Sequence, residues 1–90
     1  MFRIEYTETA EDHLRKLKKS EPKAFEKAVR LLDELAYHPT TGTGNPKPLR
    51  EDKQGRWSRR ITDKHRLVYE INGNAVLVLV LSAYGHYDDK

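Results

Sequence analysis

The most constraining feature of the sequence is the uninterrupted apolar run from Ala75 to Leu81, which directly follows Asn72-Gly73-Asn74. Asn-Gly between two apolar segments is a strong signal of a tight β-hairpin turn. A strand with no polar residue on either side is typical of an internal strand that is covered on both faces. The sequence therefore predicts a β-hairpin whose second strand lies at the centre of a sheet.

Two helices are predicted in the first half of the chain, after a short strand in which residues 2–6 alternate between apolar and polar. Thr7 or Thr9 is a suitable N-cap for the first helix, and the second is expected to start at residues 20–22, where proline occupies its first turn. The second helix is strongly amphipathic and should end at residues 37–39. Its apolar positions are Phe25, Ala28, Val29, Leu32, Leu35 and Ala36.

Residues 39–48 form a predicted loop, because they contain three prolines and two glycines. The Gly-Thr-Gly within it is a poor match to a phosphate-binding loop, since no Gly-Lys-Ser/Thr follows.

From Trp57 the sequence pattern again repeats at every second position, which indicates a strand with Trp57 on one face and Arg60 on the other. On the next strand, Arg66 should likewise face away from Leu67. A register slip of one residue would reverse both assignments.

The expected order is thus β-α-α-β-β-β, and the expected fold class is α+β. A helical hairpin packs on one face of a mainly antiparallel sheet and leaves the other face uncovered. The length of 90 residues fits a single domain over residues 1–90. Trp57 is expected to belong to the core rather than to stack on a base.

The net charge of +3 is unevenly distributed along the chain. Residues 1–40 are neutral, residues 45–66 carry a net charge of +5, and residues 67–90 carry −2. Five of the eight basic residues in the middle segment are arginines, which suit phosphate better than lysine does. The segment is either a binding surface for a polyanion or an ordinary solvated face, and the composition alone favours neither.

The absence of cysteine excludes disulfides, thiolate nucleophiles and cysteine-ligated metal centres. It permits a reducing, cytoplasmic location. No apolar stretch approaches the ~20 residues of a membrane span, and the first residues lack the layout of a signal peptide. We therefore expect a folded cytoplasmic domain with no membrane partner. The sequence shows no cofactor motif and no spacing of ligands typical of a metal site.

Four residues form the candidate chemical site: Arg60, Arg66, His86 and Tyr87. His13 and His38 are most simply surface histidines, His65 is interpreted as a structural histidine at a strand entry, and His86 follows the central strand. Two guanidiniums, an imidazole that titrates near neutral pH and a phenol suit cleavage of a phosphodiester. Because no paired carboxylates are available to hold metal ions, metal-free RNA cleavage through the 2′-hydroxyl is favoured over two-metal DNA hydrolysis.

The sequence resembles the YoeB/Txe toxins of the RelE-like toxin–antitoxin superfamily. The resemblance is carried by G-N-P-K-P-L-R at residues 44–50, G-R-W-S-R-R-I-T at 55–62, H-R-L-V-Y at 65–69 and the His86-Tyr87 pair. It implies a ribosome-dependent endoribonuclease, an mRNA interferase that cuts messenger RNA in the vacant A site and inhibits translation. It also implies a cognate antitoxin that wraps the toxin with a segment that folds on binding. Homodimer formation is left open.

The resemblance also implies roles for individual residues. Arg66 would stabilise the transition state, His86 would protonate the departing 5′-oxygen, and Arg60 would hold the phosphate. Tyr87 would orient the substrate or stack on a base. Contacts to ribosomal and messenger RNA would come from five further basic residues: Arg50, Lys53, Arg56, Arg59 and Lys64.

One position departs from the family pattern. Relatives carry a glutamate, the expected general base, where this sequence has Lys47. A lysine acts as a base only if its pKa is lowered by burial or by neighbouring cations. Lys47 is therefore expected to act as the base or as a stabiliser of the transition state, with Glu51 as a second candidate for the base. Asp88 and Asp89 would either raise the pKa of His86 or simply be solvated.

Two other functions fit the same scaffold. The first is a non-enzymatic toxin that inhibits gyrase, as the ParE-type toxins do. The second is an RNA-binding module without catalytic activity. The pair His86-Tyr87 argues against both, because it has an obvious use only in RNA cleavage.

Overall fold

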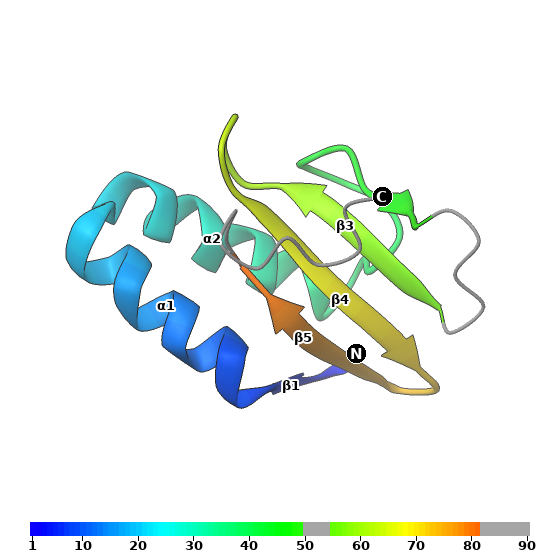
Figure 1. Ribbon diagram of the computed structural model, residues 1–90. Coiled ribbons are helices and arrows are strands. Elements are labelled where there is room, and N and C mark those ends of the chain that lie inside the picture. The colour runs from blue at the N-terminus through cyan, green and yellow to red at the C-terminus, as the bar shows by residue number, and fades with distance from the viewer. Residues whose placement is uncertain (50–54, 82–90) are drawn as a thin grey trace.

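A five-stranded sheet with the order β1-β5-β4-β3-β2 forms the centre of the molecule in the computed structural model, which describes residues 1–49 and 55–81 (Figure 1). The strands are β1 (Arg3–Tyr6), β2 (Lys47–Pro48), β3 (Arg56–Arg60), β4 (Arg66–Asn72) and β5 (Ala75–Val80). Neighbouring strands are antiparallel except β1 and β5, which are parallel. The two helices connect β1, at one edge of the sheet, to β2 at the other edge, and β1 pairs with β5 at the end of the element order.

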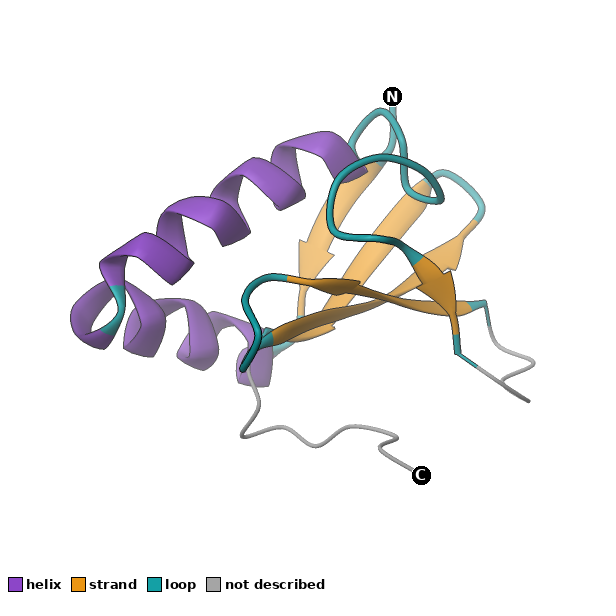
Figure 2. Cartoon of the chain, turned by 90° about the horizontal axis from the view of Figure 1, so that it is seen from above, coloured by secondary structure: helices purple, strands orange, loops and turns teal. Residues whose placement is uncertain are grey.

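The helices α1 (Glu8–Ser20) and α2 (Pro22–Leu35) form an antiparallel hairpin that lies against one side of the sheet (Figure 2). Thr7 caps α1, because its hydroxyl accepts a hydrogen bond of 3.0 Å from the backbone N–H of Ala10. Pro22 occupies the first turn of α2, where its missing N–H costs no helical hydrogen bond. Both starts agree with the sequence prediction, and α2 ends two residues before the predicted boundary.

The hydrophobic core lies between the helical hairpin and one face of the sheet. The helices contribute Ala10, Leu17, Ala28, Leu31 and Leu35, and the sheet contributes Leu67, Tyr69, Val76 and Val78, together with Ile61 directly after β3. Trp57 packs against this core from the edge, as predicted. Because side chains alternate along a strand, the residues between these core positions must point to the uncovered face.

The α+β class, the helical hairpin and the mainly antiparallel sheet are therefore confirmed. Two details differ from the prediction. Residues 47–48 of the predicted loop form β2, whose pairing with β3 comes from tertiary contact rather than from an apolar pattern. The middle strand of the five is β4 and not β5, although β5 is internal, between β1 and β4. None of the helices in the described parts of the chain is long and apolar enough to cross a membrane.

Candidate functional site

Arg60 and Arg66 lie directly opposite each other on β3 and β4, at the end of the sheet where β3 ends and β4 begins. Both side chains are exposed on the face that the helices leave uncovered. Like charges in this cross-strand position destabilise a sheet. Among the described residues, Asp63 is an acidic neighbour of Arg60, and its fully exposed carboxylate lies 3.9 Å from Arg60 Nη1. The pair therefore presents two guanidiniums that an anion can bridge.

Lys47 lies on the same face, one row further along the sheet. It pairs with Ser58, and Ser58 pairs with Val68 on the next strand. Cross-strand partners share a face, so Lys47 is the diagonal neighbour of Arg60, at a Cβ separation of about 7–8 Å. Three of the predicted site residues are thus brought together by the pairing of β2, β3 and β4.

The end of β5 lies at the same end of the sheet. Val80 pairs with Val68, two residues after Arg66, next to a β-bulge. The chain therefore leaves the sheet beside the row that contains Lys47 and Ser58. His86 and Tyr87 follow five and six residues after Leu81, but they lie outside the described residues, as do Arg50, Lys53, Glu51, Asp88 and Asp89.

Two other cations that were expected to contact RNA are engaged with carboxylates. Arg56 Nε lies 3.7 Å from Glu70 Oε1 at the far end of β3, and both side chains are largely buried. Lys64 is more than half exposed and lies 3.4 Å from Glu21 Oε2. Exposed ion pairs of this kind contribute little, about 0–1 kcal/mol, so Lys64 remains accessible to a competing anion.

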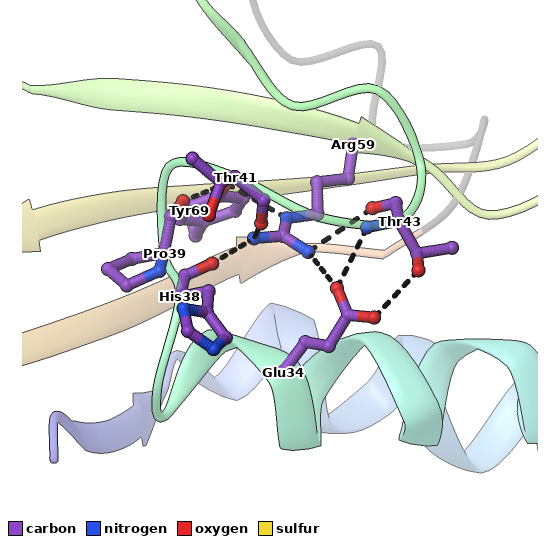
Figure 3. A network of polar contacts seen from close by, with 7 residues as sticks. All are labelled: Glu34, His38, Pro39, Thr41, Thr43, Arg59 and Tyr69. Atoms are coloured by element: carbon purple, nitrogen blue, oxygen red, sulfur yellow. Dashed lines mark hydrogen bonds and ion pairs between the residues drawn. The ribbon is translucent and has the colours of Figure 1, made fainter.

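Arg59 was expected to contact RNA, and this expectation is wrong. Its side chain is fully buried and points from β3 toward Glu34 and the loop before β2 (Figure 3). Alternation along the strand puts it on the same face as Trp57 and Ile61, which pack in the core. The guanidinium Nη1 donates to Glu34 Oε1 at 2.7 Å, and Nε donates to the phenol oxygen of Tyr69 at 3.2 Å. The alternation that exposes Arg60 therefore buries Arg59, and a run of basic residues does not reveal which member is internal.

The loop between α2 and β2 folds around this guanidinium. The carbonyl oxygens of His38, Thr41 and Thr43 all accept hydrogen bonds from Arg59, the last two at 2.7 and 3.2 Å. Gly42 adopts a φ of 108° in the turn, where a Cβ would collide with the Glu34 carboxylate. The glycines of the loop thus serve a tight turn around a buried cation, and the hydroxyl of Tyr69 completes it by donating to the Pro39 carbonyl at 2.6 Å.

Glu34 is the anionic member of this network. Thr43 donates to it twice, from its backbone N–H at 2.9 Å and from its hydroxyl at 2.7 Å. The hydroxyl contact is the largest cause that holds the pKa of the Glu34 carboxyl below its ordinary value, with further contributions from Thr43 N–H and Arg59. Glu34 is therefore ionised at neutral pH and balances the buried charge.

A second polar contact fixes the turn that leads into Arg66. His65 is fully buried, and its Nε2 lies 2.9 Å from Glu21 Oε2 at the junction of α1 and α2. This contact is the main cause that lowers the pKa of the Glu21 carboxyl. Thr62 Oγ1 accepts hydrogen bonds from the backbone N–H groups of Lys64 and His65. His65 is therefore a structural residue, as its place at a strand entry indicated.

His13 differs from the expectation of a surface histidine. Its ring is 7% exposed, and its Nδ1 accepts a hydrogen bond of 3.1 Å from the backbone N–H of Leu81. Burial is the main cause that lowers the pKa of His13, and the positive charge of Lys16 lowers it further. The helical period of α1 places His13 between Ala10 and Leu17 on the buried face, a signal that the sequence analysis did not use.

No group of three or more histidine, aspartate or glutamate side chains that could hold a metal ion occurs within residues 1–49 and 55–81. The chemically distinctive feature of this part of the chain is instead the cluster of Lys47, Arg60 and Arg66 on the uncovered face. Such a cluster is suited to binding and stabilising a negatively charged group.

The fold is that of a class of small bacterial toxins. A structure of a YoeB/ParE toxin from Agrobacterium tumefaciens superposes with a TM-score of 0.81 at 30% identity, covering 90% of this chain and 96% of the other. A dimeric YoeB from Staphylococcus aureus gives a TM-score of 0.81 at 26% identity, covering 90% and 94% of the two chains. A YoeB-YefM complex from the same species gives 0.78 at 25% identity, covering 91% and 95%.

The family follows from the sequence comparisons. Residues 6–87 match the family described as YoeB-like toxin of bacterial type II toxin-antitoxin system. The Toxin YoeB of Streptomyces coelicolor is 44% identical over 68 residues, which are 76% of this chain and 79% of the relative. The Toxin YoeB of Escherichia coli K12 is 36% identical over 59 residues, 66% and 70% of the two chains. This chain therefore belongs to the YoeB family of toxins of type II toxin–antitoxin systems.

Proposed function

We propose that this YoeB-family toxin is a ribosome-dependent endoribonuclease that cleaves messenger RNA in the A site and so inhibits translation. The observation that carries the proposal is the register pair of Arg60 and Arg66, two exposed guanidiniums side by side on the uncovered face of the sheet. Two guanidiniums in neighbouring positions suit one phosphate of an RNA backbone, where negative charge increases during cleavage. Membership of the family supports the same activity.

In the proposed reaction the 2′-oxygen of a ribose attacks the adjacent phosphorus and the bond to the 5′-oxygen breaks. The 2′-hydroxyl loses its proton to a base, and the leaving 5′-oxygen gains one from an acid. Arg66 stabilises the charge of the transition state and Arg60 holds the phosphate. Lys47, on the adjacent row, serves as the base or as a third cation. His86 is the acid and Tyr87 orients the substrate.

The partners follow from the same surface. Lys64 and the other accessible cations of the segment 45–66 contact ribosomal and messenger RNA, so binding weakens as salt rises. The Staphylococcus aureus relative has been solved in complex with YefM, which supports a cognate antitoxin for this chain. The dimeric structure from the same species supports a homodimer as a second assembly.

The proposal is tested by cleavage of a defined messenger on translating ribosomes with the purified protein. We expect Arg66→Ala and His86→Ala each to reduce the cleavage rate by at least about 100-fold, the usual effect of removing one transition-state contact or proton donor. Arg60→Ala should reduce it less if it mainly binds phosphate. The matched control is Arg15→Ala, because Arg15 is an exposed arginine of α1 with an ion pair to Asp12.

Circular dichroism and thermal unfolding of each variant establish that the fold is retained. The cleaved message should carry a 5′-hydroxyl end. Wild-type rates in the Arg66 and His86 variants would refute the assigned roles. An intact message together with inhibition of gyrase supercoiling would instead favour the non-enzymatic toxin, and salt-dependent RNA binding without cleavage would favour the RNA-binding module.

A further inference from the structure

We propose that Arg59 and Glu34 form a clamp that positions Lys47 against Arg60 and Arg66, so that Arg59 is a positioning residue for the site on the opposite face of the sheet. The inference rests on the proposed function for its effect on cleavage, whereas the position of the Lys47 strand can be measured in the absence of activity. It differs from the sequence prediction, which assigned Arg59 to the RNA-binding surface.

The clamp uses the full donor capacity of one arginine. A guanidinium with its Nε carries five N–H donors. Arg59 makes five hydrogen bonds: one to Glu34, one to the Tyr69 phenol and three to backbone carbonyls of residues 38, 41 and 43. A fully buried cation with every donor satisfied has one low-energy geometry, and departures from it cost the desolvation of an unpaired charged group. Three points of one loop are therefore held at fixed positions.

The anchored loop leads directly into β2. Thr43, the last residue that contacts Arg59 and Glu34, is followed by Gly44, whose carbonyl accepts a hydrogen bond of 2.8 Å from the backbone N–H of Arg60. Lys47 comes three residues later and pairs with Ser58. A two-residue strand at the edge of a sheet has too few hydrogen bonds to fix its own register, so the loop before it must supply the constraint.

Arg59 and Arg60 thus connect the two faces of β3. The side chain of Arg59 holds the loop from inside, while the backbone of Arg60 holds Gly44 and its side chain belongs to the site outside. The diagonal separation of Lys47 and Arg60 is set by this arrangement. An error of about 1 Å in the placement of a reacting group can lower a rate about 100-fold, so a loosened clamp should affect the chemical step.

The experiment compares Glu34→Gln with the matched control Glu26→Gln, because both residues lie on α2 and Glu26 is exposed. Residue-resolved amide hydrogen exchange reports on the loop and on β2. The informative amides are those of Arg60, which donates to Gly44, and Leu49, which donates to Arg56 at 2.9 Å. The reference amide is that of Thr7, which donates to Val78 at the other side of the sheet.

We expect Glu34→Gln to accelerate exchange of the Arg60 and Leu49 amides by about tenfold, with the Thr7 amide unchanged, as for local opening of one unit. On ribosomes, the maximal cleavage rate should fall by about tenfold while the ribosome concentration that gives half the maximal rate changes by less than about twofold. A general loss of stability would lower the fraction of folded protein and accelerate all amides together. Glu26→Gln should leave every one of these quantities unchanged.

Thr43→Val is the second variant, for use if Glu34→Gln does not fold. It removes only the hydroxyl contact of an exposed residue and should give the same pattern at smaller amplitude. Unchanged exchange at Arg60 and Leu49 would refute the clamp. Faster exchange with an undiminished maximal rate would refute positioning of the site. If the wild-type protein cleaves no message, the proposed function fails, and the exchange data alone then decide whether the clamp orders the Lys47 strand.

Discussion

Tyr69→Phe is the most discriminating test of the buried arginine network. The phenol of Tyr69 is fully buried, donates to the Pro39 carbonyl at 2.6 Å and accepts from Arg59 Nε at 3.2 Å. Replacement by phenylalanine keeps the ring in the core and removes both hydrogen bonds. It leaves one carbonyl and one guanidinium N–H without a partner in a place that water does not reach.

The size of the effect follows from these two groups. An unsatisfied buried polar group costs about 1–3 kcal/mol, with more for a charged one. The contact of Arg59 is long, so the cost of its unpaired N–H lies at the low end of that range, about 1 kcal/mol. The contact of Pro39 is short, so the cost of its unpaired carbonyl lies in the middle, about 2 kcal/mol, and the two costs together are about 3 kcal/mol. Phenylalanine has no hydroxyl that must lose its water on folding, which offsets about 1 kcal/mol of this loss. We therefore expect Tyr69→Phe to lower the free energy of unfolding by about 2 kcal/mol.

The assay is urea unfolding followed by circular dichroism, with Tyr37→Phe as the control, because the Tyr37 side chain is 64% exposed. For a slope of about 1–1.5 kcal/mol/M, typical of a small domain, the midpoint of Tyr69→Phe should fall by about 1.3–2 M urea. Tyr37→Phe should shift it by less than about 0.3 M. A loss of stability below about 0.5 kcal/mol for Tyr69→Phe would show that the network tolerates an Arg59 N–H without an acceptor. The clamp would then not require a partner for every donor of Arg59.

Two further outcomes are expected. Gly44→Ala should lower the free energy of unfolding by at least about 1 kcal/mol more than Gly73→Ala. Both glycines have a positive φ, but only at Gly44 would a Cβ lie 2.9 Å from the Arg60 carbonyl oxygen and 3.2 Å from Arg59 Cβ. Equal losses of stability in thermal unfolding would contradict this. Burial lowers the pKa of His13 in the folded state below its ordinary 6.5, so the unfolded chain binds more protons at this residue, and stability should fall as pH drops below 6.5 toward the folded pKa. His13→Gln should flatten this pH dependence in unfolding curves measured between pH 5 and 7.5. An unchanged slope of stability against pH would exclude His13 as the source of the dependence.

The fold could be predicted well from the sequence because its signals are local. The Asn-Gly turn, the apolar period of α2 and the cap at Thr7 each depend on residues a few positions apart. The strand β2 gives no such signal, since its two residues are Lys47 and Pro48 and their partners on β3, Ser58 and Trp57, lie 11 and 9 positions away. Its pairing depends on the loop that Arg59 holds, and long-range polar contacts of this kind have no sequence period.

The candidate site was predictable in part for the same reason. Alternation along β3 and β4 placed Arg60 and Arg66 on the uncovered face, and the observed register agrees. The same alternation applied to Arg59 places it inside, but its charge favoured the surface, since arginine is almost never fully buried without a partner. The partner, Glu34, lies 25 residues earlier on the exposed side of an amphipathic pattern, and nothing in the spacing connects the two.

The residues on either side of Arg59 decide the register of β3. A slip of one residue in one direction would put Ser58 in the place of Arg59, and Glu34 and three carbonyl oxygens of the loop would lose the guanidinium that binds them. A slip in the other direction would put Arg60 in that place, but it would also put Ser58 and Thr62 in the apolar places of Trp57 and Ile61. Burying a large apolar side chain contributes about 1.5–3 kcal/mol, more than the about 0–1 kcal/mol that exposed charges exert on each other. The buried side of β3 therefore decides the register, and the register places Arg60 opposite Arg66 in spite of their like charges.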